Sequence, residues 1–256
     1  MRIYTTGDIC LTGNGKLVRA DRLPGRQGRL VFAYLVAEFG RAVSRDELED
    51  MLWPRRVPTA ADAGLSAIIS KLRAIFIELG VGRGAVRAAA GGYQLSLPAE
   101  TWIDTQAALE SVHLAEAALQ VGDVRGAYGP AVVACSILRR PFMAGDDEAW
   151  IVRRREALCT ARVRALDCLA QIHIATGEHA LALRAAEETV ELEPFREAGY
   201  RRLMLVHDAV GNRAEAVRVY AQLEALLDVE LKTTPGPETR RVMEAVAGKS
   251  LAAGGE

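Results

Sequence analysis

The chain has 256 residues, of which half are hydrophobic, 5% aromatic and 25% charged, and its formal net charge is −1. This length favours two domains of ordinary size, and the shortage of aromatic side chains favours close-packed helices over a β-sandwich. The four cysteines are scattered and no apolar run approaches the roughly 20 residues of a membrane helix, which argues against a disulfide framework, a metal site or a membrane partner. The sequence predicts a reduced, cytoplasmic protein.

Charge is distributed unevenly along the chain. Residues 1–100 contain 14 arginines and lysines against 10 aspartates and glutamates, a net of +4, and the rest of the chain has a net charge of −5. A basic first part suits a module that meets phosphate, and an acidic second part suits a module that meets protein.

The first predicted elements are strands and a helix. Residues 2–20 consist of short apolar stretches around Asn14 and Gly15, a dipeptide that favours the tight turn of a β-hairpin. The apolar residues within 26–39 form a helical stripe, and Gly40 supplies the C-terminal stop. A small antiparallel sheet is therefore expected to precede the helices.

A second helix is predicted from a capping signal. Ser44 and Glu47 have the spacing of a capping box, in which both side chains reach back to free backbone N–H groups. Residues 54–59 begin and nearly end with proline, so they cannot continue this helix and should be exposed. They contain Arg55 and Arg56.

A third helix is predicted over residues 60–79. Its apolar positions follow helical spacing throughout: Leu65, Ile68, Ile69, Leu72, Phe76 and Leu79. Burying each side chain stabilises the domain by roughly 1.5–3 kcal/mol. Residues 86–95 then predict a second hairpin that turns at Gly91 and Gly92.

Helical periodicity continues nearly to the end after a boundary at residues 98–103. Gly177 and Gly211 are 34 residues apart, as are Ala182 and Ala216, and this is the tetratricopeptide period. The large aromatic consensus is mostly missing, so we expect a degenerate array of helical hairpins. The predicted fold is mainly α with a small β component.

The order of sheet, helices and hairpin is that of a winged helix-turn-helix, whose third helix enters the major groove. Opposite its apolar stripe this helix carries Ser66, Ala67, Ser70, Lys71, Arg73 and Ala74. Each good bidentate base contact discriminates by ~1–3 kcal/mol, and Arg83 and Arg87 lie where a wing reaches the minor groove or backbone. Basic residues on an exposed helix are more often merely solvated, but their place in this domain favours DNA contact.

The sequence resembles a known family, the bacterial activators of the SARP type (Streptomyces antibiotic regulatory proteins), over about residues 1–247. The motifs are 40–48 (GRAVSRDEL), 52–54 (LWP), 69–73 (ISKLR), 90–95 (AGGYQL), 193–197 (EPFRE), 203–204 (LM), 211–216 (GNRAEA) and Tyr220. The resemblance implies an OmpR-like winged-helix DNA-binding domain at 1–98, a bacterial transcriptional activation domain at 102–247 and a disordered tail at 248–256.

Further expectations follow from this resemblance. The family binds direct repeats in double-stranded DNA near promoters, often as two molecules side by side, and activates by contacting RNA polymerase. By position, Ser66, Ser70, Lys71 and Arg73 fall on the recognition helix and Gly91, Gly92 and Tyr93 on the wing, and Arg87 lies beside it. The loop with Arg55 and Arg56 matches a loop placed to touch the transcription machinery. The recognition helix departs from the family pattern by having fewer long polar side chains.

An enzyme and an interaction scaffold are the two alternatives to a DNA-binding regulator. No phosphate-binding loop, dinucleotide motif or catalytic constellation is present, so we predict neither an enzyme nor a cofactor. The alternative is a protein-interaction scaffold built on the helical repeats, with a winged helix of weak or no DNA affinity. DNA affinity with a steep salt dependence distinguishes the alternative from the regulator.

Overall fold

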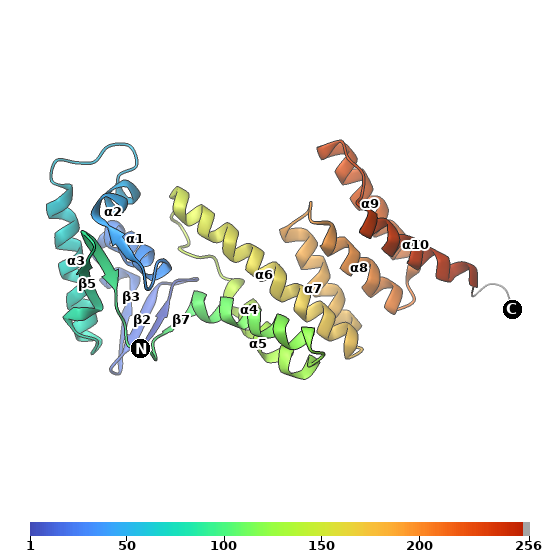
Figure 1. Cartoon of the computed structure of the whole chain (residues 1–256), viewed down its shortest axis with the longest axis horizontal. Helices are drawn as coiled ribbons and strands as arrows, with labels where there is room; N and C mark the ends of the chain where they lie inside the picture. Colours follow the sequence, from blue (N-terminus) through green and yellow to red (C-terminus); the bar gives the residue numbers. More distant parts are fainter. Residues whose placement is uncertain (253–256) are drawn as a thin grey trace. The chain divides into compact units, whose positions relative to one another are not determined.

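The computed structural model describes residues 1–252, with side chains through residue 248. The chain forms two compact units, one of residues 1–108 and 137–158, the other of residues 109–136 and from 159 onward. The described residues are mainly helical with small sheets, which confirms the predicted fold class (Figure 1). In this part of the chain no helix is both long and apolar enough to cross a membrane.

The N-terminal strands of the first unit form a sheet with the order β3-β2-β1-β7. They are β1 (Arg2–Tyr4), β2 (Cys10–Gly13), β3 (Lys16–Arg19) and β7 (Trp102–Ile103). The predicted turn is present, with positive φ at Asn14 and Gly15. Ile3 pairs with Leu11 and Leu11 with Val18, and all three are fully buried. One face of this sheet therefore forms part of the core.

The next part of the first unit combines helices with a second sheet of order β4-β6-β5. The elements are α1 (Gly25–Ala37), β4 (Ala42–Ser44), α2 (Arg45–Leu52), α3 (Ala61–Glu78), β5 (Val86–Ala89) and β6 (Gly92–Leu95). The three helices predicted for this part of the chain are present as α1, α2 and α3, and the predicted hairpin is present as β5 and β6. The hairpin turns at Ala90 and Gly91, which have positive φ, one residue earlier than the glycine pair suggests.

The predicted capping box at the start of α2 is half formed. Ser44 Oγ accepts a hydrogen bond from the Glu47 N–H at 3.1 Å, as expected. The Glu47 carboxylate instead accepts from Arg41 at 2.6 and 2.9 Å and from Tyr34 Oη at 2.6 Å. A guanidinium fork satisfies a carboxylate better than one backbone N–H. Burial and this bond to Glu47 raise the pKa of Tyr34 to about 12.

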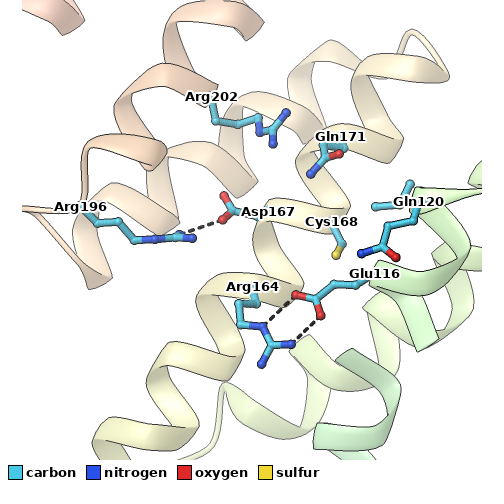
Figure 2. A pocket seen from close by; sticks show the side chains of 9 residues that line it. Glu116, Gln120, Arg164, Asp167, Cys168, Gln171, Arg196 and Arg202 are labelled. Atoms are coloured by element: carbon cyan, nitrogen blue, oxygen red, sulfur yellow. Dashed lines mark hydrogen bonds and ion pairs between the residues drawn. The ribbon is translucent and has the colours of Figure 1, made fainter. Parts of the chain in front are cut away.

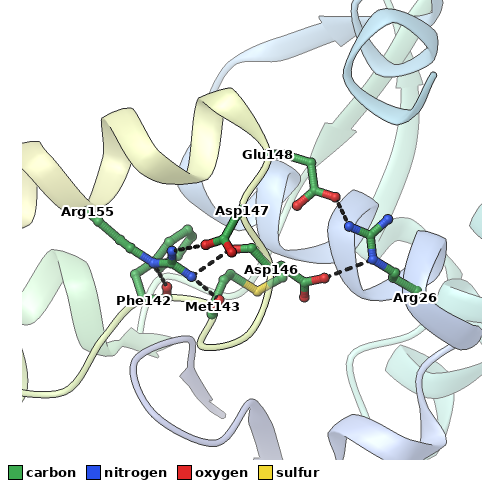
Figure 3. Close-up of polar contacts among 7 residues, drawn as sticks. All are labelled: Arg26, Phe142, Met143, Asp146, Asp147, Glu148 and Arg155. Atoms are coloured by element: carbon green, nitrogen blue, oxygen red, sulfur yellow. Dashed lines mark hydrogen bonds and ion pairs between the residues drawn. The ribbon is translucent and has the colours of Figure 1, made fainter. Parts of the chain in front are cut away.

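The second segment of the first unit is held by arginines (Figure 3). Arg26 of α1 donates to Asp146 at 3.0 Å and to Glu148. Arg155 donates from Nε to the Phe142 carbonyl at 2.7 Å and from Nη2 to the Asp146 carbonyl at 2.6 Å. The Arg26 bonds hold residues 146–148 against α1, and the Arg155 bonds hold the segment before α6 (Ala149–Ala175) to that helix.

Asp104, at the start of α4 (Asp104–Gln120), is bonded to the residues that follow β1. Its fully buried carboxylate accepts from the N–H and hydroxyl groups of Thr5 and Thr6 at 2.8–2.9 Å. It also accepts from the Thr105 N–H at 2.7 Å. The compact unit therefore continues past residue 98, where the sequence predicts the DNA-binding domain to end.

The remaining elements are helices, and α4, α5 and α6 have residues in both units. They are α4 (Asp104–Gln120), α5 (Val124–Leu138), α6 (Ala149–Ala175), α7 (His179–Leu192), α8 (Glu197–Ala209), α9 (Arg213–Leu231) and α10 (Pro237–Ala252). The predicted disordered tail, 248–256, begins inside α10, and residues 253–256 lie outside the described residues.

One turn recurs between helices of the second unit. At each copy a glycine has positive φ and the next N–H donates to the carbonyl five residues earlier, at 2.8–2.9 Å. The glycines are Gly122, Gly177 and Gly211, and the residues five positions later, Ala127, Ala182 and Ala216, are fully buried. Small buried residues allow neighbouring helices to approach closely. Both glycines of the 34-residue spacing therefore form this turn, and Gly122 forms another copy that the period alone does not indicate.

Candidate nucleic-acid interface

The helix α3 has one buried and one exposed face. Its predicted apolar stripe is buried, and the Phe76 ring lies 6.4 Å from that of Phe32 in α1. Ser70 and Lys71 are exposed on the other side, and Ser66 is half-buried. The core therefore fixes the rotation of α3 about its axis, which decides the side chains that face outward.

Arg73 links α3 to the hairpin. Its Nε donates to the Val86 carbonyl at 2.8 Å, and its guanidinium carbon lies 5.9 Å from the centroid of the Tyr93 ring. Half-buried, it is less available to a ligand than Lys71. Arg73 thus has a structural role that its position on the helix does not reveal.

Arg45 of α2 takes part in the same cluster, and the sequence reasoning missed it. Its Nη2 donates to Tyr93 Oη at 2.7 Å, and its guanidinium carbon lies 5.1 Å from that ring centroid. It also pairs with Asp62 and reaches Ser66 Oγ at 3.5 Å. Arg45 and Tyr93 are 48 residues apart, so no local spacing could have linked them.

The predicted wing residues differ in their surroundings. Tyr93 is only 5% exposed, beneath the two arginines. Gly92 is buried against β4, where an added Cβ would lie 1.9 Å from the Val43 carbonyl oxygen. Gly91 is exposed, with φ +73° and open space around it. Of these residues, Gly91 alone presents backbone to solvent, and the other two hold the hairpin in place.

A hollow of about 530 Å³ lies between α3 and the hairpin. Its polar lining brings together Ser70, Arg73, Arg83 and Arg87, and none of its described lining residues is a carboxylate. Arg87 is oriented by Gln94, whose Oε1 accepts from Nε at 3.1 Å and from Nη2 at 2.7 Å. Clustered cations without a neutralising acid produce a positive potential that attracts phosphate.

The segment between α2 and α3 is exposed, as predicted. Residues 54–60 are all exposed, including Arg55, Arg56 and the apolar Val57, whose exposed fraction is 42%. Within the described part of the chain, neither arginine forms a hydrogen bond or ion pair. Both are free to contact another molecule.

The described residues contain no group of three histidine, cysteine, aspartate or glutamate side chains placed to hold a metal ion. The four cysteines are unpaired thiols. Burial raises the pKa of Cys135 to about 12 and that of Cys168 to about 11, so both thiols are protonated near neutral pH.

Comparison with protein families matches a known domain to this chain. The model of the bacterial transcriptional activator domain matches residues 103–247, more than half of the chain. This matched region begins at the end of β7 and includes most of the helical array.

The curated relatives are regulators. The chain is 28% identical over 220 residues to regulatory protein AfsR of Streptomyces coelicolor, covering 86% of this chain and 22% of AfsR. It is 29% identical over 238 residues to transcriptional regulator RedD of the same organism, covering 91% and 65%. For transcriptional regulatory protein EmbR of Mycobacterium tuberculosis the values are 27% over 223 residues, covering 85% and 56%. The chain thus spans less than two thirds of the length of each of these three relatives.

The fold is similar to that of a solved structure. It is Mycobacterium tuberculosis EmbR in complex with a low affinity phosphopeptide, with a TM-score of 0.89 and 24% identity. The match covers 97% of this chain and 65% of the EmbR chain. The arrangement of elements in this chain is therefore shared with a transcriptional regulator.

Proposed function

The chain belongs to the bacterial transcriptional activator domain family and is a SARP-type transcriptional regulator, and from this premise we propose that it binds double-stranded DNA through α3 and the β5–β6 hairpin. Residues 1–98 are in this proposal an OmpR-like winged-helix DNA-binding domain, and residues 102–247 are the activation domain. The hairpin is the wing.

The hollow between α3 and the wing carries this proposal. It gathers Arg73, Arg83 and Arg87 with no carboxylate in its described lining, beside the exposed Lys71. Contacts to phosphate position a protein on DNA, and contacts to base edges give specificity. We assign Ser66, Ser70 and Lys71 to the major groove and Arg83, Arg87 and Gly91 to the backbone or minor groove.

Tyr93, Gly92 and Arg73 act differently in this proposal. Tyr93 lies beneath Arg45 and Arg73 and sets where both guanidinium groups lie. Gly92 allows β6 to approach β4. These residues affect DNA affinity by positioning their neighbours. Lys71 and Arg83 have no hydrogen bond or ion pair within the described residues, so substituting them tests DNA contact without breaking an internal bond.

The test is a selection of bound fragments from random double-stranded DNA, followed by titration of the protein with the most enriched fragment at several salt concentrations. The wild type is expected to enrich a repeated motif and to show a steep negative slope of log affinity against log salt, because bound cations release counterions. Lys71→Gln with Arg83→Gln is expected to weaken binding by about 10–100-fold and to make the slope shallower by about 2.

Arg2→Gln is the matched control. Arg2 is an exposed cation of the same unit on β1, outside the hollow, and its substitution removes one positive charge, as each of the two substitutions in the hollow does. It is expected to leave affinity within about twofold. If no motif is enriched and binding shows no salt dependence, DNA recognition is refuted, and the helical array as an interaction scaffold becomes the better explanation.

We further propose that two molecules bind direct repeats near a promoter and that the exposed 54–60 loop contacts RNA polymerase. Its free Arg55 and Arg56 beside exposed Val57 support this assignment. Arg55→Ser with Arg56→Ser is expected to lower transcription in a purified polymerase assay by about tenfold and to leave DNA affinity unchanged. Equal loss of transcription and DNA affinity would assign the loop to DNA instead.

A further inference from the structure

The second unit contains a polar pocket of about 440 Å³, within the size range of small-molecule sites. Helices α4, α6 and α8 and the α7–α8 turn supply its lining (Figure 2). Its charged groups are Arg164, Arg196, Arg202, Glu116 and Asp167. Three guanidinium groups against two carboxylates leave one positive charge without a counterpart in the described lining.

Two of the arginines are already satisfied by the protein. Arg164 donates from Nε and Nη2 to the two Glu116 oxygens at 2.8 and 2.5 Å. Arg196 donates to Asp167 Oδ2 at 2.8 Å. Figure 2 shows these bonds and none from Arg202.

Arg202 is the group without an acceptor. Its Nε is buried and has no hydrogen-bond partner, and within the described residues the side chain forms no ion pair. Burial lowers the pKa of this guanidinium from its usual value, and repulsion from Arg196 and Arg201 acts in the same direction against the attraction of Asp167. Burying a charge without a hydrogen-bonded partner destabilises the folded state.

The other lining groups favour a negatively charged occupant. Gln120 and Gln171 supply amide groups able to donate hydrogen bonds. The Cys168 thiol, protonated near neutral pH, does not repel an anion. Both Glu116 oxygens are occupied by Arg164, so this carboxylate is not available to pair with Arg202.

We propose that this pocket binds a small molecule through a carboxylate or phosphate group that pairs with the Arg202 guanidinium, whose Nε lacks an acceptor. A planar guanidinium can donate two parallel hydrogen bonds to the oxygens of either group. Such a ligand would link α8 to α4 and α6 inside the proposed activation domain. This site is independent of DNA binding by α3.

The test uses the full chain with inorganic phosphate and succinate as probes, and sodium chloride at equal ionic strength as the screening control. The readouts are the thermal unfolding midpoint and the NMR signal of the Arg202 Nε–H group. A saturable response to either probe beyond that to chloride is expected. A response to phosphate alone indicates a phosphorylated ligand, and one to succinate alone indicates a carboxylic acid.

Arg202→Gln is expected to weaken this response at least tenfold, and Arg184→Gln, at an exposed arginine of α7, is the matched control and should not change it. Without probe, Arg202→Gln should unfold at the same or a higher temperature, because it removes an unpartnered buried charge. A lower midpoint, an equal response in Arg202→Gln, or binding of an oligoglutamate peptide but of neither small anion would overturn the proposal.

Discussion

Arginines gather at two places in this molecule, and their surroundings differ. In the hollow beside α3, Arg83 and Arg87 lie near no carboxylate among the described lining residues. In the pocket of the second unit, Arg164 and Arg196 are paired with carboxylates and only Arg202 lacks an acceptor. Each lining contains three arginines, so a count of arginines alone would not distinguish the two sites.

The difference shows that function depends on which cations the protein leaves unpaired. An open group of cations suits an extended polyanion, because phosphates along DNA meet several charges at once. A single unpaired cation among paired ones suits a single anionic group.

The largest effect is expected at Gly92, which holds the hairpin and therefore the arginine-bearing side of the hollow. In Gly92→Ala the new Cβ would meet the Val43 carbonyl oxygen at 1.9 Å, so β4 and β6 must separate. We expect a loss of about 3 kcal/mol or more in the free energy of unfolding, measured by urea denaturation.

Gly91→Ala is the matched variant. It has open space but a φ of +73°, so it should cost only about 1 kcal/mol. Equal losses in the two variants would show that backbone conformation rather than contact with β4 limits this hairpin.

The next effect concerns Arg73, which belongs both to the hollow and to the fold. Arg73→Met removes the bond to the Val86 carbonyl and the contact with Tyr93. We expect a loss of about 1–1.5 kcal/mol in stability together with at least a tenfold loss in DNA affinity. Arg83→Gln should lower affinity without lowering stability. An Arg73→Met protein of wild-type stability would contradict the structural role.

Arg164 of the second unit, which is paired with Glu116, should behave in the opposite way to Arg83: its loss should lower stability and leave DNA affinity unchanged. Arg164→Met breaks the bond to Glu116 in a partly exposed pair, so stability should fall by about 1 kcal/mol and DNA affinity should not change. A double-mutant cycle with Glu116→Gln measures the coupling directly. A loss of DNA affinity in Arg164→Met would break the contrast between the two arginine clusters.

The smallest effect is a pH dependence. The hydrogen bonds from Arg164 hold the pKa of Glu116 below its usual value of 4.5, so this pair stabilises the fold fully above that pH. Its contribution is lost as the pH falls through the lowered pKa of the folded state. Between pH 5 and 3, the wild type should lose more stability than Glu116→Gln, by a few tenths of a kcal/mol. Parallel curves would mean that the pair contributes nothing.

The sequence by itself determined the local elements. The apolar spacing of α3, the turn at Asn14 and Gly15, and the hydroxyl cap at Ser44 depend on residues a few positions apart, and all are found in the structure. The 34-residue spacing likewise identified two of the turns in the helical array. Periodicity and turn chemistry act over short distances along the chain, so they can be read directly.

Only the tertiary structure decided which of the candidate residues are available. Tyr93 and Gly92 belong to the motifs of a wing, but packing against Arg45 and β4 buries them. Arg202 stands among many arginines in sequence, and its lack of an acceptor depends on where α4, α6 and α8 place Glu116 and Asp167. Ion pairs and burial join residues tens of positions apart, and no local pattern records which partners meet.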